Sequence, residues 1–162
     1  MQRSHESFGS AKREFDCRPG PSLGSRFMAL KINLKPGERI IVGGAVITNG
    51  KNATSFLIEN NVPILRQKDI LTESQANTPC RRIYLVVQLM YIDGANLTWH
   101  HNTYWSLVKG VVKAAPSTLP LIDRMSDLIL NNHYYQALKV AKKLIEYEEE
   151  AVRHARRTTG NL

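Results

Sequence analysis

The 162-residue sequence has few cysteines, and their placement excludes two kinds of small domain. Cys17 and Cys80 are far apart and lack the CxxC spacing of zinc and redox sites. They also make no disulfide framework of the kind that stabilises small secreted domains. We therefore expect no metal, no other cofactor, and a cytoplasmic protein.

Long hydrophobic runs are missing as well. The longest, IYLVVQLMYI at residues 83–92, is too short to cross a bilayer and contains Gln88. Residues 1–27 hold no continuous apolar segment like the core of a secretory signal. We expect no contact with a membrane.

The short motifs of common enzyme classes are absent. The sequence contains no Walker loop, no GxSxG and no HExxH. His100 and His101 are the best metal or catalytic candidates, but adjacent residues point to different sides of a helix and do not chelate as an i, i+4 pair does. We expect these histidines to have a structural or surface role, and we expect the protein not to be an enzyme.

Acidic residues number 14 against 22 basic ones, which gives a net charge of +8. Such a balance favours contact with nucleic acid, an anionic surface or an acidic protein. The excess is spread thinly, and only the end of the chain, with Arg153, Arg156 and Arg157 and no acid, is clearly basic. Charge alone is a weak argument for nucleic acid.

Periodicity divides the chain into four parts. Residues 1–27 show no period and contain Pro-Gly-Pro and Gly-Ser pairs, so we expect a disordered leader and translation that starts at Met28. Residues 28–75 alternate in hydrophobicity, which predicts a β module. Residues 76–150 show helical spacing, and residues 151–162 are interpreted as a basic flexible tail.

The β module is predicted to hold five short antiparallel strands. Leu30, Ile32 and Leu34 alternate with polar residues, which is the period of a half-buried strand. Pro63 places the last strand at an edge, because proline donates no hydrogen bond to a neighbouring strand. The predicted strands cover residues 30–34, 39–42, 45–48, 53–59 and 62–66. A module this small buries little surface, so we expect it to pack on the helices or on a second copy of itself.

Three dipeptides are predicted to shape the turns of the module. Pro36-Gly37 fits a type II turn, because glycine tolerates positive φ at the second central position. Gly43-Gly44 is predicted to break or bulge the second strand. Asn49-Gly50 predicts a hairpin after the third strand, because both central residues of a type I′ turn have positive φ.

The second half predicts about four helices, and the whole is an α+β fold in which a five-stranded β module precedes a helical hairpin or bundle. Thr78 and Pro79 are typical of an N-cap and a first helical residue. The β-branched residues behind them leave a strand open as the alternative. Helix ends are indicated by Asp93-Gly94, Ala115-Pro116 and Asn131-Asn132. The last helix, YYQALKVAKKLIEYEEE, carries one apolar stripe with lysines facing outward.

Four segments resemble the FlbT family in the family's order, and together they cover about residues 28–150. They are LKINLKPGERIIVGGAVITNG, PILRQKDIL, TPCRRIYLVVQLMYID and YYQALKVAKKLIEYE. The resemblance implies a post-transcriptional repressor of flagellin synthesis in flagellum biogenesis. Such a protein binds the 5′ leader of flagellin messenger RNA and promotes its degradation. The resemblance also implies a partner, the FlaF family of flagellin-synthesis regulators.

The β module is in addition similar to the carbon storage regulator CsrA, an RNA-binding translational repressor. In that family the first strand leads to a Gly-Glu turn, as in Gly37-Glu38 here, and the last strand ends in a run like ILRQKDI. The arginine of that run contacts RNA there, and the first and last strands pair across a domain-swapped dimer. The likeness implies Arg66 as an RNA contact, followed by Lys31.

We therefore expect a homodimer whose RNA-binding residues are Arg66, Lys68, Lys31, Lys35 and Arg39. An arginine fork matches phosphate or a guanine edge. The alternative for Arg66 is an exposed strand-end arginine paired with Asp69 or Glu59. An aromatic platform for bases is missing from the β module, where Phe56 is the one aromatic residue. The competing function is a protein-binding adaptor or export chaperone for flagellin or FlaF, which acts on messenger RNA indirectly.

Overall fold

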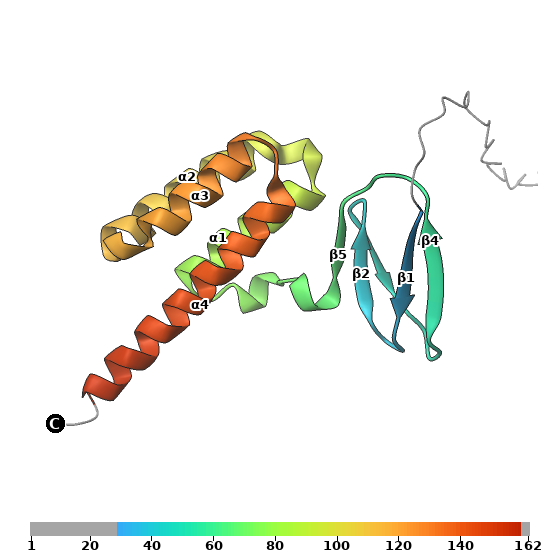
Figure 1. Ribbon diagram of the computed structural model, residues 1–162, viewed down its shortest axis with the longest axis horizontal. Helices are drawn as coiled ribbons and strands as arrows, with labels where there is room; N and C mark the ends of the chain where they lie inside the picture. Colours follow the sequence, from blue (N-terminus) through green and yellow to red (C-terminus); the bar gives the residue numbers. More distant parts are fainter. Residues whose placement is uncertain (1–28, 160–162) are drawn as a thin grey trace, which may run out of the picture.

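The computed structural model describes residues 29–159, which form a β module beside a helical half (Figure 1). Five antiparallel strands lie in two small sheets, and four α-helices follow them. The predicted α+β class is therefore confirmed. The predicted leader, residues 1–27, lies outside the described residues.

The first sheet pairs β1 (Leu30–Leu34) with β4 (Thr54–Ile58), and Ile32 lies opposite Phe56. The second sheet has the order β3-β2-β5 and contains the remaining three strands. These are β2 (Arg39–Val42), β3 (Ala45–Thr48) and β5 (Ile64–Arg66). Alternation works as expected, since inward residues of both sheets form a small core made of Ile32, Leu34, Ile40 and Ile58.

The β2–β3 hairpin turns at Gly43-Gly44, where a break or bulge was predicted. Both glycines have positive φ, 55° and 84°, as a type I′ turn requires, and Val42 pairs directly with Ala45. The hairpin predicted at Asn49-Gly50 is wrong, because β3 and β4 belong to different sheets. Gly37, with φ of 70°, confirms the turn predicted after β1.

Asn49 ties two loops together instead of turning a hairpin. Its side-chain amide donates to the carbonyl oxygens of Leu34, Lys35 and Asn52 at 3.2, 2.8 and 2.9 Å. Its backbone N–H donates to the carbonyl of Glu38 at 2.9 Å. The short polar side chain thus supplies donors that a turn glycine would lack.

The helical half consists of α1 (Pro79–Ile92), α2 (Leu97–Ala114), α3 (Leu119–Leu130) and α4 (Tyr134–Thr159). Short 3-10 turns occupy Gln67–Asp69, Glu73–Gln75, Gly94–Asn96 and Pro116–Thr118. The Thr78 side chain accepts a hydrogen bond from the Arg81 N–H, so the predicted N-cap is confirmed. α4 packs against both α1 and α3. Among the helices of residues 29–159, none has the length and apolar character that a membrane span requires.

α4 runs past residue 150, where the sequence pattern predicted that the helix would end. α4 continues to Thr159, and residues 151–158 are exposed helix where the sequence pattern predicted a flexible tail. In Figure 1 this end of α4 projects beyond the other helices. Glutamates before it and arginines within it are good helix formers, and the arginines suit the negative end of the helix dipole.

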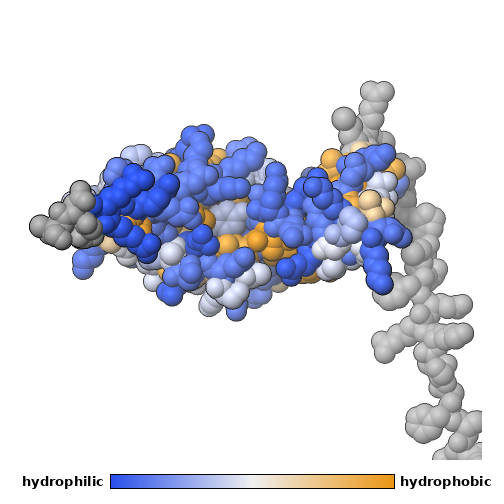
Figure 2. Space-filling model, turned by 90° about the horizontal axis from the view of Figure 1, so that it is seen from below, coloured by the Kyte–Doolittle hydropathy of each residue, from blue (hydrophilic) through white to orange (hydrophobic). Residues whose placement is uncertain are grey.

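The two halves are joined by packing and by hydrogen bonds. Ile41 and Leu65 of the second sheet are buried in the helical core. The Tyr91 hydroxyl of α1 accepts the Ile64 N–H at 3.1 Å, and the Tyr84 hydroxyl donates to the Asp69 carbonyl at 2.7 Å. Figure 2 shows hydrophobic residues on the surface between the halves and on the β module, while hydrophilic residues cover the far end of the helices. The second sheet therefore packs on the helical half, and two tyrosines of α1 supply hydrogen bonds between the halves.

Candidate nucleic-acid interface

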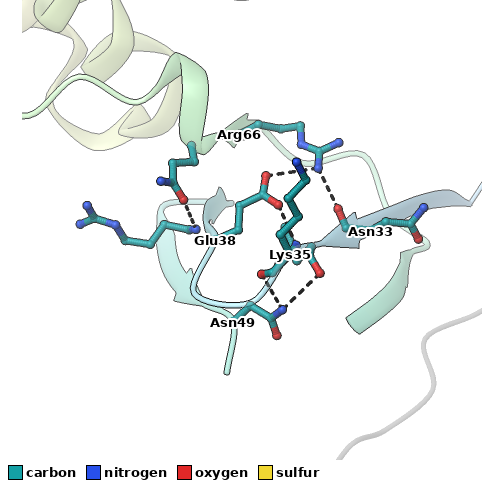
Figure 3. A network of polar contacts seen from close by, with 8 residues as sticks. Asn33, Lys35, Glu38, Asn49 and Arg66 are labelled. Atoms are coloured by element: carbon teal, nitrogen blue, oxygen red, sulfur yellow. Dashed lines mark hydrogen bonds and ion pairs between the residues drawn. The ribbon is translucent and has the colours of Figure 1, made fainter. Parts of the chain in front are cut away.

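Arg66 ends β5 opposite Ile40 of β2, and its side chain reaches across to β1. One guanidinium nitrogen, Nη2, donates to the Asn33 carbonyl at 2.7 Å and lies 3.3 Å from Glu38 Oε1 (Figure 3). The Arg66 side chain stays 45% exposed. The predicted alternative of a pair with Asp69 or Glu59 is wrong, because Glu38 stands just before β2 and β2 is the strand beside β5.

Glu38 holds this corner in place. Its carboxylate accepts the Lys35 backbone N–H at 2.8 Å and also faces Arg66. The Lys35 hydrogen bond, followed by the hydrogen bond and charge of Arg66, lowers the pKa of Glu38 below its ordinary 4.5. Glu38 is therefore ionised at neutral pH and fixes one edge of the arginine fork. The other guanidinium N–H groups make no hydrogen bond within residues 29–159 and face solvent, where an anion can reach them.

Arg66 and Lys31 line one groove between the free edges of β5 and β1, which we call the strand-edge groove. Its volume is about 640 Å³. From the helical half, Tyr91 and Tyr135 close it. Two of the five predicted RNA-binding residues thus share a concave surface with two tyrosines.

Lys68 lies in an adjoining groove, the lysine groove, which has a volume of about 290 Å³. The charged residues that line it are Lys68, Lys139, Lys142, Lys143, Asp69 and Glu146. Lys142 Nζ is 3.7 Å from Asp69 Oδ1, so one lysine is partly neutralised. The groove keeps an excess of positive charge.

Lys35 and Arg39, the other two predicted residues, line neither groove. Lys35 sits in the turn after β1, and Arg39 starts β2, where its backbone N–H donates to Gln67 Oε1 at 2.8 Å. Both side chains are exposed on the same end of the module as Glu38. Lys35 and Arg39 therefore lie near the two grooves but do not line either of them.

Tyr135 was missed by reasoning from the sequence, and it is the residue that both grooves share. The residue is 44% exposed, and its ring centroid lies 5.7 Å from that of Tyr91, at an interplanar angle of 41°. Lys139 Nζ stands 4.8 Å from its centroid. Surfaces that bind single-stranded nucleic acid combine cationic and aromatic side chains, because phosphates pair with the charges and bases stack on the rings.

The histidine pair takes no part in this surface. His100 is buried, and its Nε2 lies 3.3 Å from Asp93 Oδ2, which caps the turn before α2. Asn96 and then His100 lower the pKa of Asp93. His101 packs edge-on against Tyr134. Within residues 29–159, no group of three or more His, Cys, Asp or Glu side chains is placed to hold a metal ion.

Comparison with known proteins gives the family. The model of the family described as "Flagellar protein FlbT" matches residues 30–152. The chain belongs to the FlbT family. The match spans both halves of the fold, so the strand-edge groove, the lysine groove and the helices as far as residue 152 lie within the FlbT region.

FlbT relatives are similar over most of their length. A probable flagellum biosynthesis repressor protein FlbT 1 of Bradyrhizobium diazoefficiens is 54% identical over 124 residues, which are 76% of this chain and 84% of that protein. A probable repressor FlbT of Rhodopseudomonas palustris is 45% identical, over 76% of this chain and 97% of that one. The flagellum biosynthesis repressor FlbT of Caulobacter vibrioides is 36% identical, over 78% and 92%. No solved structure matches the chain.

Proposed function

We propose that this protein is a post-transcriptional repressor of flagellin synthesis, which binds the 5′ leader of flagellin messenger RNA and promotes its degradation in the cytoplasm. Membership of a family whose relatives carry the name flagellum biosynthesis repressor supports a repressor role in flagellar synthesis. The proposal that it binds RNA rests on one observation. The two grooves meet at Tyr135, so that cationic residues of the β module and of the helical half form one surface.

The chemistry of the grooves favours a single strand. Arg66 offers a planar fork to a phosphate or a base edge, and the lysines follow as looser point charges. The strand-edge groove, with tyrosines on one side, admits unpaired bases, whereas the bases of a duplex are already stacked on each other. A protein held on the leader blocks access of the ribosome, and an untranslated messenger is open to nucleases.

Filter binding to flagellin leader RNA tests this function, with a shuffled RNA of equal composition as the control. Arg66→Ala is expected to weaken binding by about 1–3 kcal/mol, because it removes a charge-assisted contact. Lys68→Ala is expected to cost less, since a flexible ammonium makes a looser phosphate contact. If about four phosphates are neutralised, log affinity falls with log salt at a slope of about −3.

Equal affinity of Arg66→Ala and the parent protein for leader RNA would remove Arg66 from the interface. Melting curves belong beside each titration, because the Glu38 and Asn33 contacts of Arg66 link three strands. We expect little change in melting temperature, since the pair is half-exposed.

A second candidate function, a protein-binding adaptor or export chaperone, is favoured by a groove on the helices. This helix groove, of about 440 Å³, lies between α1, α2 and α4 and is lined mainly by small and apolar side chains. Glu148 Oε1 accepts the Cys80 N–H at 3.4 Å, but the buried Glu148 Oε2 has no hydrogen-bond partner within residues 29–159. An amphipathic helix that presents a lysine or arginine to Glu148 fits this surface. The proposed occupant is a helix of the FlaF-family regulator, or of flagellin.

Gly110→Glu separates the two functions. Gly110 lines the helix groove, and a Cβ there meets nothing within 4 Å, so a larger side chain has room to enter the groove; a melting curve checks the fold of the variant. If the adaptor function holds, this variant loses binding to a purified FlaF-family protein or flagellin in a pull-down. Its affinity for leader RNA stays the same, because the helix groove and the strand-edge groove share no residue.

A further inference from the structure

We propose that Tyr135 is a stacking platform for one unpaired base, at the point where the strand-edge groove meets the lysine groove. The inference rests on the proposed RNA-binding function and names the group that reads the strand. Tyr135 lines both grooves and leaves 44% of its surface open. An aromatic side chain that is open at a crossing of two grooves is placed to receive a flat ligand.

Tyr91 has a structural role in the fold, whereas Tyr135 does not. Tyr91 packs against the helical core, and its hydroxyl is engaged by the Ile64 N–H. Tyr135 does not belong to that core, which α4 enters through Tyr134, Ala137, Leu138 and later residues of its apolar stripe. Tyr91 is thus held in place by the core and by its hydrogen bond. Tyr135 is the tyrosine of the pair whose ring is exposed enough to bind a base.

In the absence of RNA, the Lys139 ammonium lies over the Tyr135 ring. The ammonium stands 4.8 Å from the Tyr135 centroid, one helical turn further along α4. A cation–π contact at an exposed site is weaker than stacking of a base on the same ring. A base therefore displaces Lys139, and the freed ammonium takes up a phosphate.

The path of the bound strand follows α4. Tyr135, Lys139, Lys142 and Lys143 recur at helical spacing, and all four line the lysine groove. A single strand with one base on Tyr135 therefore lays its neighbouring phosphates along these lysines. On the other side, Arg66 and Lys31 hold the backbone across the strand-edge groove. A duplex offers no base to Tyr135 and binds by charge alone.

The test uses single-stranded oligoadenylate RNA of about 12 nucleotides, a length typical of such sites. Matched probes are the same oligomer with abasic positions, a duplex of equal length, and AMP. The protein variants are Tyr135→Ala, Tyr135→Phe and Lys139→Ala, each checked by circular dichroism and thermal melting. Affinity is measured by fluorescence anisotropy, and stacking by quenching of a 2-aminopurine placed within the oligomer.

We expect Tyr135→Ala to weaken binding of the oligomer about tenfold and to abolish the quenching. Tyr135→Phe should bind within about twofold of the parent, because the ring is retained. The abasic oligomer should bind the parent and Tyr135→Ala alike. Lys139→Ala should keep the quenching, because the Tyr135 ring is retained, and should lower the salt dependence of binding of the intact oligomer, because it removes a phosphate contact.

Three results would overturn the inference. Unchanged affinity and quenching with Tyr135→Ala would show that the base lies elsewhere, while the proposed function survives. AMP competing as well as the oligomer would make the site a nucleotide pocket. Failure of the parent protein to bind any single-stranded RNA would overturn the proposed function and the stacking platform with it.

Discussion

At the scale of single residues, Glu38 organises the corner of the β module at which Arg66 lies. It accepts the Lys35 N–H and pairs with Arg66, so one carboxylate fixes both the turn after β1 and the arginine at the end of β5. Asn33 completes the frame through its carbonyl oxygen. The position of the arginine fork thus depends on the charge of Glu38, and pH is a means to change it.

The lowered pKa of Glu38 predicts the pH dependence of folding. Because the folded state lowers this pKa below 4.5, the stabilisation is complete above about pH 4.5 and is lost as the pH falls through the folded-state value. Between about pH 5 and pH 3, the melting temperature of Glu38→Gln should fall by less than that of the parent protein, because the variant has no carboxylate to protonate at this position. Glu59→Gln, at an exposed position, is the control and should follow the parent. Parallel pH profiles for Glu38→Gln and the parent would contradict the prediction.

The sequence predicted part of this site. Arg66 and Lys31 were reached through the likeness of their strands to an RNA-binding β module, and they do line one groove. The sequence does not reveal Tyr135 as part of this site, because the residue lies on α4, about 70 positions after Arg66. That Tyr135 lines the same groove as Arg66 depends on how the two halves pack, and a local pattern carries no information on that packing.

At the scale of elements, the β2–β3 hairpin shows where local turn signals fail. Asn-Gly and Gly-Gly both permit a type I′ turn, and the sequence offers the two pairs only six residues apart. The fold uses Gly43-Gly44, because β3 then pairs with β2 while β4 is free to pair with β1. Most strand and helix bounds follow from alternation and capping, whereas the choice between two permitted turns depends on which sheet each strand joins.

Alanine substitutions distinguish the two turns. Gly44→Ala should destabilise the protein by about 1–2 kcal/mol or more, because φ is 84° and the new Cβ would lie 3.3 Å from the Ile92 carbonyl oxygen. Gly50→Ala should be neutral or stabilising by up to about 1 kcal/mol, since Gly50 lies outside the positive-φ region and a Cβ meets nothing within 4 Å. Urea denaturation measures both. A larger loss at Gly50 than at Gly44 would place the hairpin where the sequence first suggested it.

At the scale of the whole molecule, the β module is unequally covered. The helices bury one face of the second sheet through Ile41 and Leu65, but β3 is exposed along its whole length. Val46 is 65% exposed, and the outer edge of β3 has no strand beside it within residues 29–159. An open apolar edge of this kind invites pairing with another strand.

We propose that the protein is a homodimer in which β3 pairs with β3 of a second copy. Antiparallel pairing of two identical edges closes on itself, which is the geometry of a two-fold dimer, and it leaves the strand-edge groove between β1 and β5 open for RNA.

Light scattering at micromolar concentration should give about twice the mass of one chain. Val46→Lys should give a monomer, because a charge on an edge strand opposes pairing. Leu130→Lys, at a 63% exposed leucine of α3, is the matched control and should stay dimeric. A monomeric parent protein would show that the β module is stable on the helices alone.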